Sequence, residues 1–474
     1  MAETAARPVR LTGFRAARWA WRFARDPLVA ARDAFDAFGP FLVLAAAVPL
    51  TRPRRTVLLD VPLVLTAGPA FNRELLSDPA TWRGVSLLPG GPRNSAARRI
   101  SQGLTRVTGE RHVQYRRLLA PPLHKDSVRA SAARMAQLAE AEVASWPTGE
   151  TVDLWDQPRR VMQRLAIELL FGGGDEQGYH IADMVSRLMQ GKWSPGAFVP
   201  INLPVTPYGR IVRESELLER RILHWAQSKR GRTDSHDLAS IIVNSSDADG
   251  RPLPDAAIIG QIPSLVAAAS EAAQSALTWT LLLVAQHPEV ASNLVEELRS
   301  KLAGPPPAVA AAGELPYLAA VVDESMRILP PVPVQIRVAQ RETTIADCPV
   351  PAGTRVMLST FLTNRMPDLY PEGDVFRPER WFGMARSPFQ YPVFSGGPHG
   401  CPGYWFGLQG VRIALAAILT RYRPEFAPDA RIDYKVQPTM RPLHKVPMRL
   451  VPQDGAFAAA PISGTIAKVV RFPQ

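Results

Sequence analysis

The sequence predicts a mainly α-helical protein with a small β region, folded as one large domain. Long segments between residues 130 and 330 carry apolar residues at the three- and four-residue spacing of helices. Segments that alternate like short strands lie near residues 38–66 and again beyond residue 334. A sheet built from such distant strands favours one interwoven domain, although 474 residues exceed the usual size of a single core.

At the N-terminus, residues 1–25 are predicted to form a basic amphipathic arm, with arginines and aromatic residues at helical spacing. Two interpretations stay open: the arm lies on an acidic membrane surface, or it folds back on its own domain. The apolar run 38–50 has a proline near each end and is shorter than the roughly 20 residues that cross a bilayer. We therefore expect a strand there, paired with residues 56–66.

The central part of the chain is predicted to be helical. The segments with the clearest helical period are residues 130–146, 159–171, 213–230, 255–286 and 317–329. The longest of them is apolar, but Glu271 and Gln274 interrupt it, so it indicates a central core helix, distorted at Pro263, and no membrane span. Strands are expected over 334–340, 342–360 and the start of 361–370.

Composition narrows the class of protein. Hydrophobic residues make up 46% and charged residues 21%, which is typical of a soluble globular protein with a large core. The formal charge is +12, but apart from the local excess in the N-terminal arm the basic residues are spread out, with no block of interleaved aromatic residues, so nucleic-acid binding is not expected. Two cysteines and no signal-peptide pattern indicate a reducing cytoplasm.

One of the two cysteines lies in a loop of unusual composition, FSGGPHGCPG, residues 394–403. A lone Cys401 cannot hold zinc in the usual four-ligand manner, and no second cysteine or histidine stands at zinc spacing. A cofactor that takes one axial sulfur fits better, because glycines let the backbone approach a flat group. Amides of the loop and of a helix starting near Tyr404 would stabilise a thiolate. An inert buried thiol would leave the glycines unexplained.

The loop resembles the haem-binding signature of the cytochrome P-450 family, the haem-thiolate monooxygenases, in its bacterial soluble type. The resemblance is carried by Phe394, Gly397, His399, Cys401 and Gly403. It implies haem b with Cys401 as the axial iron ligand, held between the cysteine loop and the long central helix. It covers residues 26–453 as one haem-thiolate domain, which leaves residues 454–474 as a C-terminal extension without an interpretation.

Other marks of the family follow in the expected order. Glu324 and Arg327 match its Glu-x-x-Arg pair, and Arg380 in FRPERW matches the arginine that completes this network. The resemblance implies that the network supports folding and haem retention. The residues similar to partners of the anionic haem propionates are His112, Arg116, Arg337 and His399.

The central helix departs from the family pattern where oxygen is activated. Glu271 holds the acid position, but Ala272 stands where the family has a threonine whose hydroxyl helps deliver protons. Proton delivery by a positioned group contributes about 100-fold to 10,000-fold. Three replacements stay open: a substrate hydroxyl, a water held by Glu271 and Gln274, or Ser275. A tolerated small residue with water filling the gap is also consistent with the sequence.

The resemblance implies a monooxygenase that hydroxylates a lipophilic small molecule with O₂ and electrons from a separate ferredoxin and ferredoxin reductase. We expect a monomer. The basic residues expected to steer an acidic partner are Arg111, Arg117, Lys125 and Arg129. The substrate pocket is expected to be lined by residues 84–103, by a mobile 193–210 loop, and by Val266, Ala267, Ala269, Val332 and Val334.

Two other functions stay open at this stage. The missing threonine motivates a haem-thiolate enzyme that uses peroxide or catalyses coupling, desaturation or rearrangement in a biosynthetic pathway. A haem protein that binds ligands without turnover is the third candidate. Retention of Glu271 argues against it, because an acid in an apolar helix is costly to keep.

Overall fold

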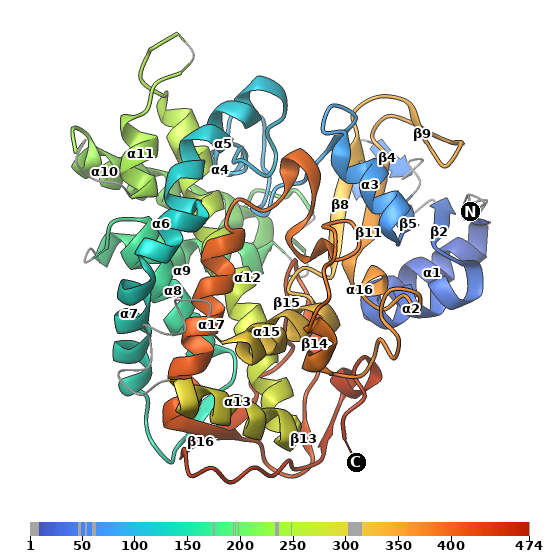
Figure 1. Ribbon diagram of the computed structural model, residues 1–474. Helices are drawn as coiled ribbons and strands as arrows, with labels where there is room; N and C mark the ends of the chain where they lie inside the picture. Colours follow the sequence, from blue (N-terminus) through green and yellow to red (C-terminus); the bar gives the residue numbers. More distant parts are fainter. Residues whose placement is uncertain are drawn as a thin grey trace.

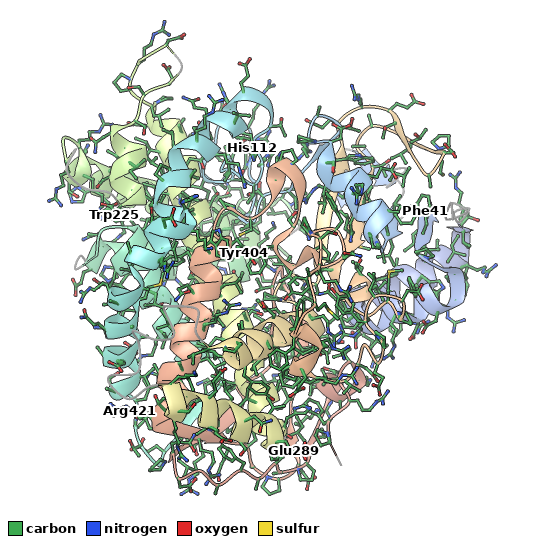
Figure 2. All side chains as sticks on the ribbon, viewed as in Figure 1. Phe41, His112, Trp225, Glu289, Tyr404 and Arg421 are labelled. Atoms are coloured by element: carbon green, nitrogen blue, oxygen red, sulfur yellow. The ribbon has the colours of Figure 1, made fainter. Side chains whose placement is uncertain are left out.

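The computed structural model describes residues 9–45, 49–52, 55–58, 63–173, 176–192, 194, 196–197, 199–232, 237–247, 249–301 and 315–473. Figure 1 shows a large helical part beside a smaller region of sheet. Phe41 in the sheet and Trp225 among the helices, both fully buried, mark the two sides in Figure 2. The predicted mainly α fold with a small β region is confirmed.

The helices carry the bulk of the core. In chain order they are α1 (Gly13–Arg25), α2 (Pro27–Phe38), α3 (Pro69–Ser77), α4 (Ala96–Ile100), α5 (Gly109–Leu123), α6 (Lys125–Ala130), α7 (Ala132–Ala144), α8 (Asp156–Leu170), α9 (Glu176–Gly191), α10 (Pro207–Lys229), α11 (Leu238–Asn244), α12 (Asp255–Gln286), α13 (Pro288–Lys301), α15 (Pro316–Ile328), α16 (Thr360–Thr363) and α17 (Tyr404–Arg421). Local sequence sets many of their starts. Thr206, for example, accepts a hydrogen bond from the Gly209 N–H while Pro207 occupies the first turn of α10.

The strands come from both ends of the chain. They are β1 (Val9–Thr12), β2 (Phe41–Ala45), β3 (Pro49–Arg52), β4 (Arg55–Leu58), β5 (Leu63–Thr66), β6 (Trp82–Arg83), β7 (Thr151–Asp153), β8 (Val334–Ala339), β9 (Thr343–Ile345), β10 (Cys348–Val350), β11 (Arg355–Ser359), β12 (Tyr422–Glu425), β13 (Ala430–Arg431), β14 (Tyr434–Val436), β15 (Met440–Pro442), β16 (Pro447–Pro452) and β17 (Ile462–Ser463). The main sheet has the order β1-β2-β5-β11-β8-β6. Its centre therefore joins strands almost 300 residues apart in the sequence, as expected of one interwoven domain.

The predicted pairing of residues 38–50 with 56–66 is present as β2 against β5, with Phe41 opposite Thr66. Between them β3 and β4 form a separate two-stranded ladder. Parts of the two predicted strands, residues 46–48 and 59–62, lie outside the described residues. One strand prediction is wrong: the start of residues 361–370 belongs to the helical turn α16, where the Ser359 hydroxyl caps the Leu362 N–H.

The basic N-terminal arm folds back on the domain over its described part. β1 runs parallel to β2 at the sheet edge, and α1 packs on α2, where the Trp19 and Phe38 rings lie 5.5 Å apart. Arg22 of α1 forms an ion pair with Asp33 of α2. Phe14 and Trp21 remain exposed on the outer side of α1.

The central helix α12 runs through the middle of the helical part as one continuous element that includes Pro263. In the described part of the chain it is the one helix whose length and apolar composition suffice to cross a membrane. Most of its apolar window is buried inside the protein, as expected of a core helix. It packs against α8, α15 and α17, which brings it beside the helix that follows the cysteine loop.

The C-terminal extension also lies against the domain. β17 pairs in parallel with β13, and Arg471 forms an ion pair with Asp374 on the segment before FRPERW. The Thr465 N–H donates to the Asp433 carboxylate. The last described residues thus brace the loop that holds Arg380.

Candidate active site

The cysteine loop has a fixed backbone path. The Cys401 N–H donates to the Phe394 carbonyl at 2.8 Å, and α17 starts three residues after the cysteine. Gly397 has a φ of +61°, and a Cβ there would lie 2.3 Å from the Leu76 carbonyl of α3. Only glycine fits this position, because the backbone is left-handed and α3 is too close. The Phe394 ring packs edge-on against Tyr404, with ring centroids 4.7 Å apart.

Cys401 is the one cysteine in this loop, and its side chain is exposed. Close packing of the loop raises the pKa of the Cys401 thiol, while the Gly403 N–H and the charge of Arg116 oppose this rise. The same N–H would stabilise a metal-bound thiolate. The loop therefore presents one accessible sulfur with a hydrogen-bond donor directed at it.

Cationic and imidazole groups surround the loop on one side. The His112 and His399 rings stack with centroids 3.9 Å apart, and Arg116 donates to the Gly400 carbonyl at 2.5 Å. Figure 2 shows His112 on α5 above Tyr404, which lies at the start of α17 near the middle of the view. Burial and the neighbouring positive groups lower the pKa of His399 to about 4, so it is neutral at pH 7.

Arg337 completes this group from β8. Its guanidinium donates to the Ser395 hydroxyl at 3.1 Å, and burial lowers its pKa to about 10. Among the described residues Arg337 donates to the Ile336 carbonyl and to the Gln335 and Ser395 side chains, and Arg116 to the Gly400 carbonyl, all of them neutral groups. His399 Nε2 is buried without a hydrogen-bond partner among the described residues. Two arginines and a histidine without carboxylate partners fit an anionic group such as a haem propionate.

The residues present therefore fit haem. Cys401 would hold the iron, and the group around Arg337, His112, Arg116 and His399 would hold the propionates. Bound haem would supply the redox chemistry that none of these side chains can carry out.

The Glu-x-x-Arg pair forms a fully buried network. Arg327 donates to both carboxylate oxygens of Glu324 at 2.7 and 2.8 Å, and Arg380 Nε donates to Glu324 Oε1 at 2.8 Å. The Trp381 indole adds a bond to Glu324 Oε2 at 2.9 Å. Arg327 also donates to the Asn364, Gly373 and Val375 carbonyls. Because this network ties α15 to the segment before the cysteine loop, it braces the loop from behind.

The middle of α12 has one accessible face. Ala268 is exposed and Ala272 is half-buried, four residues apart on a helix that is otherwise mostly buried. Ala269 and Ser270, between them in sequence, are also partly accessible, although Ser270 lies on another side of the helix. The sequence prediction missed Ala268 and Ser270, although the four-residue spacing from Ala272 would have indicated Ala268. Small side chains leave room against this face.

Glu271 is buried next to the accessible face. Burial raises its pKa to about 7, and the nearby Arg441 guanidinium and Thr439 hydroxyl only partly offset this effect. Its Oε2 has no hydrogen-bond partner among the described residues. Near neutral pH this carboxyl exists in both protonation states, which suits a group that takes up and releases protons.

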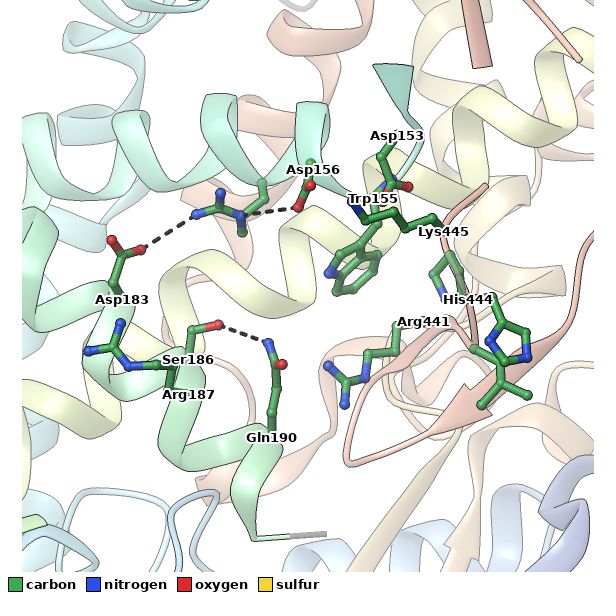
Figure 3. A pocket seen from close by; sticks show the side chains of 13 residues that line it. Asp153, Trp155, Asp156, Asp183, Ser186, Arg187, Gln190, Arg441, His444 and Lys445 are labelled. Atoms are coloured by element: carbon green, nitrogen blue, oxygen red, sulfur yellow. Dashed lines mark hydrogen bonds and ion pairs between the residues drawn. The ribbon is translucent and has the colours of Figure 1, made fainter. Parts of the chain in front are cut away.

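Arg441 connects Glu271 to a depression of about 340 Å³. Figure 3 shows Arg441, His444 and Lys445 on one side of this depression and Asp183, Ser186 and Gln190 on the other. Its lining is strongly polar, so it suits water better than a lipophilic ligand. Arg441, whose charge acts on Glu271, is one of the residues that line it.

The structure places the two other predicted catalytic residues in packing contacts. Gln274 donates to the Trp155 carbonyl at 3.0 Å, and the Ser275 hydroxyl donates to the Met440 carbonyl at 2.5 Å. Trp279 donates to the same carbonyl at 3.0 Å. The proton of Ser275 is therefore engaged, which leaves Glu271 as the acid beside Ala272.

Predicted pocket residues divide by accessibility. Val266 and Ala267 are buried in the packing of α12, whereas Ala269, Val332 and Val334 remain partly accessible. Of the predicted 193–210 loop, residues 193, 195 and 198 lie outside the described residues. Val199, Ile201, Leu203 and Val205 in the same loop are exposed. A lipophilic surface is therefore available next to α10.

The four predicted docking residues are all exposed on α5 and α6. Lys125 Nζ lies 5.2 Å from the centroid of the Trp405 ring, in a cation–π contact. Trp405 itself is partly exposed and follows Cys401 by four residues. The basic surface thus reaches the segment that carries the cysteine.

Comparison with known proteins agrees with this site. The family model described as Cytochrome P450 matches residues 90–450. Cyclooctat-9-en-7-ol 5-monooxygenase of Streptomyces melanosporofaciens is 28% identical over 76% of this chain and 79% of its own length. Pentalenene oxygenase of Streptomyces avermitilis is 26% identical over 72% of this chain and 78% of its own length.

Solved structures share the fold. The retinoic acid bound cyanobacterial CYP120A1 superposes with a TM-score of 0.74 at 22% identity, covering 89% of this chain and 93% of that chain. The identified residues and the matched family model lead to one conclusion. The chain belongs to the cytochrome P450 family and is an iron-dependent haem oxidoreductase with Cys401 as the axial thiolate ligand.

Proposed function

We propose that the protein is a monooxygenase that hydroxylates a lipophilic, terpenoid-like small molecule with O₂ and electrons from a separate ferredoxin and its reductase. The observation that carries the proposal is the accessible, alanine-lined face of α12 beside the buried acid Glu271. Bacterial relatives whose names describe terpenoid oxygenation support the substrate class.

Each group of residues has its own role in the proposed reaction. Bound haem would supply the oxygen-activating redox chemistry, and the Cys401 thiolate would hold its iron. Glu271 holds a proton near Ala272 and exchanges it with water on the Arg441 side. Ala268 and Ala272 leave space for a bulky apolar skeleton over this face. The exposed cations near Trp405 receive an acidic ferredoxin through electrostatic steering.

The bacterial relatives support a cytoplasmic location. A monomer remains part of the proposal. The test is reconstitution of the holoenzyme with a surrogate ferredoxin, its reductase and a panel of terpenoid hydrocarbons and alcohols. We expect a product that gains one oxygen atom from isotopically labelled O₂. The Cys401→Ser variant should form none of it. If compounds of the panel bind but no product contains labelled oxygen, the proposal is contradicted.

One observation favours a second candidate. Ala272 offers no hydroxyl for proton delivery, and the Ser275 hydroxyl is engaged with Met440. A peroxide-using enzyme, or a catalyst of coupling, desaturation or rearrangement, does not need that hydroxyl. Product formation with hydrogen peroxide alone, without reductant, would favour this candidate.

A further inference from the structure

Five cationic side chains gather where the main sheet meets the segment after β6 and the end of α9. We name them the cation cluster; its members are Arg83, Arg98, Arg106, Lys192 and Arg355. They come from β6, α4, the loop before α5, the end of α9 and β11, so the fold brings them together from separate parts of the chain.

The sheet register places two of them on one face. Arg83 of β6 and Arg355 of β11 both lie opposite Val338 of the intervening strand β8. Side chains directly opposite each other in neighbouring strands point to the same face. Arg337 precedes Val338 and therefore points to the other face, where it contacts Ser395. The cation cluster is thus separate from the cations at the haem edge.

Close backbone contacts bring the other members to this face. A Cβ on Gly84 would lie 2.4 Å from the Thr105 carbonyl, so the neighbouring residues Arg83 and Arg106 lie side by side. Lys192 Nζ donates to the Ser86 carbonyl at 3.0 Å, three residues after Arg83. Arg98 joins them electrostatically, since its charge acts on both Arg83 and Arg106.

Arg83, Arg106 and Lys192 are partly buried, and the charges of the cluster repel one another. Burial first, and then neighbouring arginines, lower the pKa values of Arg83 and Arg106. Burial, Arg355 and Arg106 lower the pKa of Lys192 to about 8. Gathering like charges away from water is unfavourable unless an anion compensates them.

The described part of the chain supplies no such anion to the arginines of the cluster. No ion pair with a carboxylate is formed there by Arg83, Arg98, Arg106 or Arg355. The neighbouring Arg99 is different, because it holds Glu219 through two bonds of 2.5 and 2.6 Å. Among the described residues, a carboxylate therefore pairs with Arg99 and none with these four arginines.

The loop that carries Arg106 also contacts the helix that carries the alanine face. The Leu104 N–H, two residues before Arg106, donates to Gln261 Oε1 of α12 at 3.1 Å. Gln261 precedes Ala272 on the same helix by about three turns, or about 16 Å at 1.5 Å per residue. The loop of the cluster and the face at Ala272 are therefore linked through α12.

We propose that the cation cluster binds the carboxylate or phosphate end of an otherwise lipophilic substrate and directs its far end to the face at Ala272. This inference rests on the proposed function for the oxidation itself, but not for the binding. Oxyanions suit the cluster because guanidinium groups bind them through paired, charge-assisted hydrogen bonds.

Isothermal titration calorimetry of the holoenzyme tests the inference with dodecanoate, dodecyl phosphate and the neutral 1-dodecanol. We expect at least one anion to bind about 10-fold to 100-fold more tightly than the alcohol, the gain typical of hydrogen bonds to charged groups. The stronger of the two identifies carboxylate or phosphate as the natural group. Arg106→Gln and Arg355→Gln should each remove most of this difference and leave the affinity for the alcohol unchanged.

Arg93→Gln is the matched control, because Arg93 is exposed in the same segment and outside the cluster. Arg355 is exposed, so its substitution should not disturb folding even where Arg106→Gln does. Equal affinities for the anions and the alcohol would overturn the inference, and so would equal losses in Arg93→Gln. Inorganic phosphate binding as tightly as the dodecyl anions would overturn the role in substrate binding. Calorimetry measures binding without turnover, so a failure of the proposed oxidation gives a separate result.

Discussion

Glu324 and Arg327 form a bidentate ion pair one helical turn apart, with both side chains completely buried. Arg380 adds a third charge to the same carboxylate. Two positive charges around one buried carboxylate are stable only while that carboxylate is present. The pair therefore has a direct consequence for stability.

Glu324→Gln should destabilise the protein by about 3 to 5 kcal/mol, because it leaves two buried guanidinium groups without their carboxylate. Urea unfolding of the holoenzyme measures this change, and the haem absorbance of the purified variant reports cofactor retention. Glu372→Gln is the control, since Glu372 pairs with Arg377 on the surface and should cost under about 1 kcal/mol. Equal effects of the two substitutions would mean that the buried network has no special role.

Glu271 should make stability depend on pH. Its pKa is raised from 4.5 to about 7, so the folded protein binds a proton that the unfolded chain has lost between these two values. Stability should therefore fall as pH rises from about 4.5 to 7, by up to about 3 kcal/mol from this group. Glu271→Gln should remove that slope and be the more stable protein above pH 7. Glu289→Gln, on the exposed surface of α13, should keep the slope.

The same carboxyl should control turnover. We expect Glu271→Gln to lower the rate of product formation by about 100-fold or more, since proton delivery by a positioned group contributes that much. The variant should also lose any inflection near pH 7 from the pH–rate profile. An unchanged profile with an unchanged rate would show that protons arrive by another route.

Ala272→Thr tests the departure from the family pattern. If the missing hydroxyl limits proton delivery, the variant should form more product per electron consumed, by a factor of up to about 100. Ala268→Thr places a hydroxyl one turn earlier on the same face and serves as the control. Unchanged coupling in Ala272→Thr would mean that the alanine has no mechanistic role.

Charge reversal tests the docking surface near the cysteine. The double variant Lys125→Glu and Arg129→Glu should slow electron transfer from a ferredoxin about 10-fold or more at low salt, and the difference should shrink as salt is added. Stopped-flow reduction of the haem measures this rate. Arg220→Glu, exposed on α10, should leave it unchanged. Equal rates for the unchanged protein, the double variant and Arg220→Glu would show that this surface does not receive the ferredoxin.

Sequence patterns predicted the elements whose local signals are strong. The predicted helix 255–286 coincides with α12, and the predicted 317–329 helix differs from α15 by one residue at each end. The short alternation at the start of 361–370 wrongly predicted a strand, because four residues are too few to distinguish a strand from a turn of helix. A hydrophobic pattern predicts an element well when it extends over many residues.

Contacts between distant segments were beyond the reach of the sequence. The hairpin of β14 and β15 brings Thr439 and Arg441 to Glu271 across some 170 residues, and no local signal marks that approach. The cation cluster likewise depends on the register of β6, β8 and β11. From the sequence, Ser275 is a candidate proton donor. In the structure its hydroxyl donates a hydrogen bond to the Met440 carbonyl of the same hairpin.

The most direct test of the account compares two ways of driving the holoenzyme with the same lipophilic substrate panel. One reaction contains O₂, reductant and a surrogate ferredoxin with its reductase, and the other contains hydrogen peroxide alone. We expect efficient product formation with O₂ and reductant, dependent on Cys401 and strongly reduced in Glu271→Gln. Product with peroxide alone, and none with O₂ and reductant despite reduction of the haem, would contradict it and make the alanine at position 272 the centre of a different mechanism.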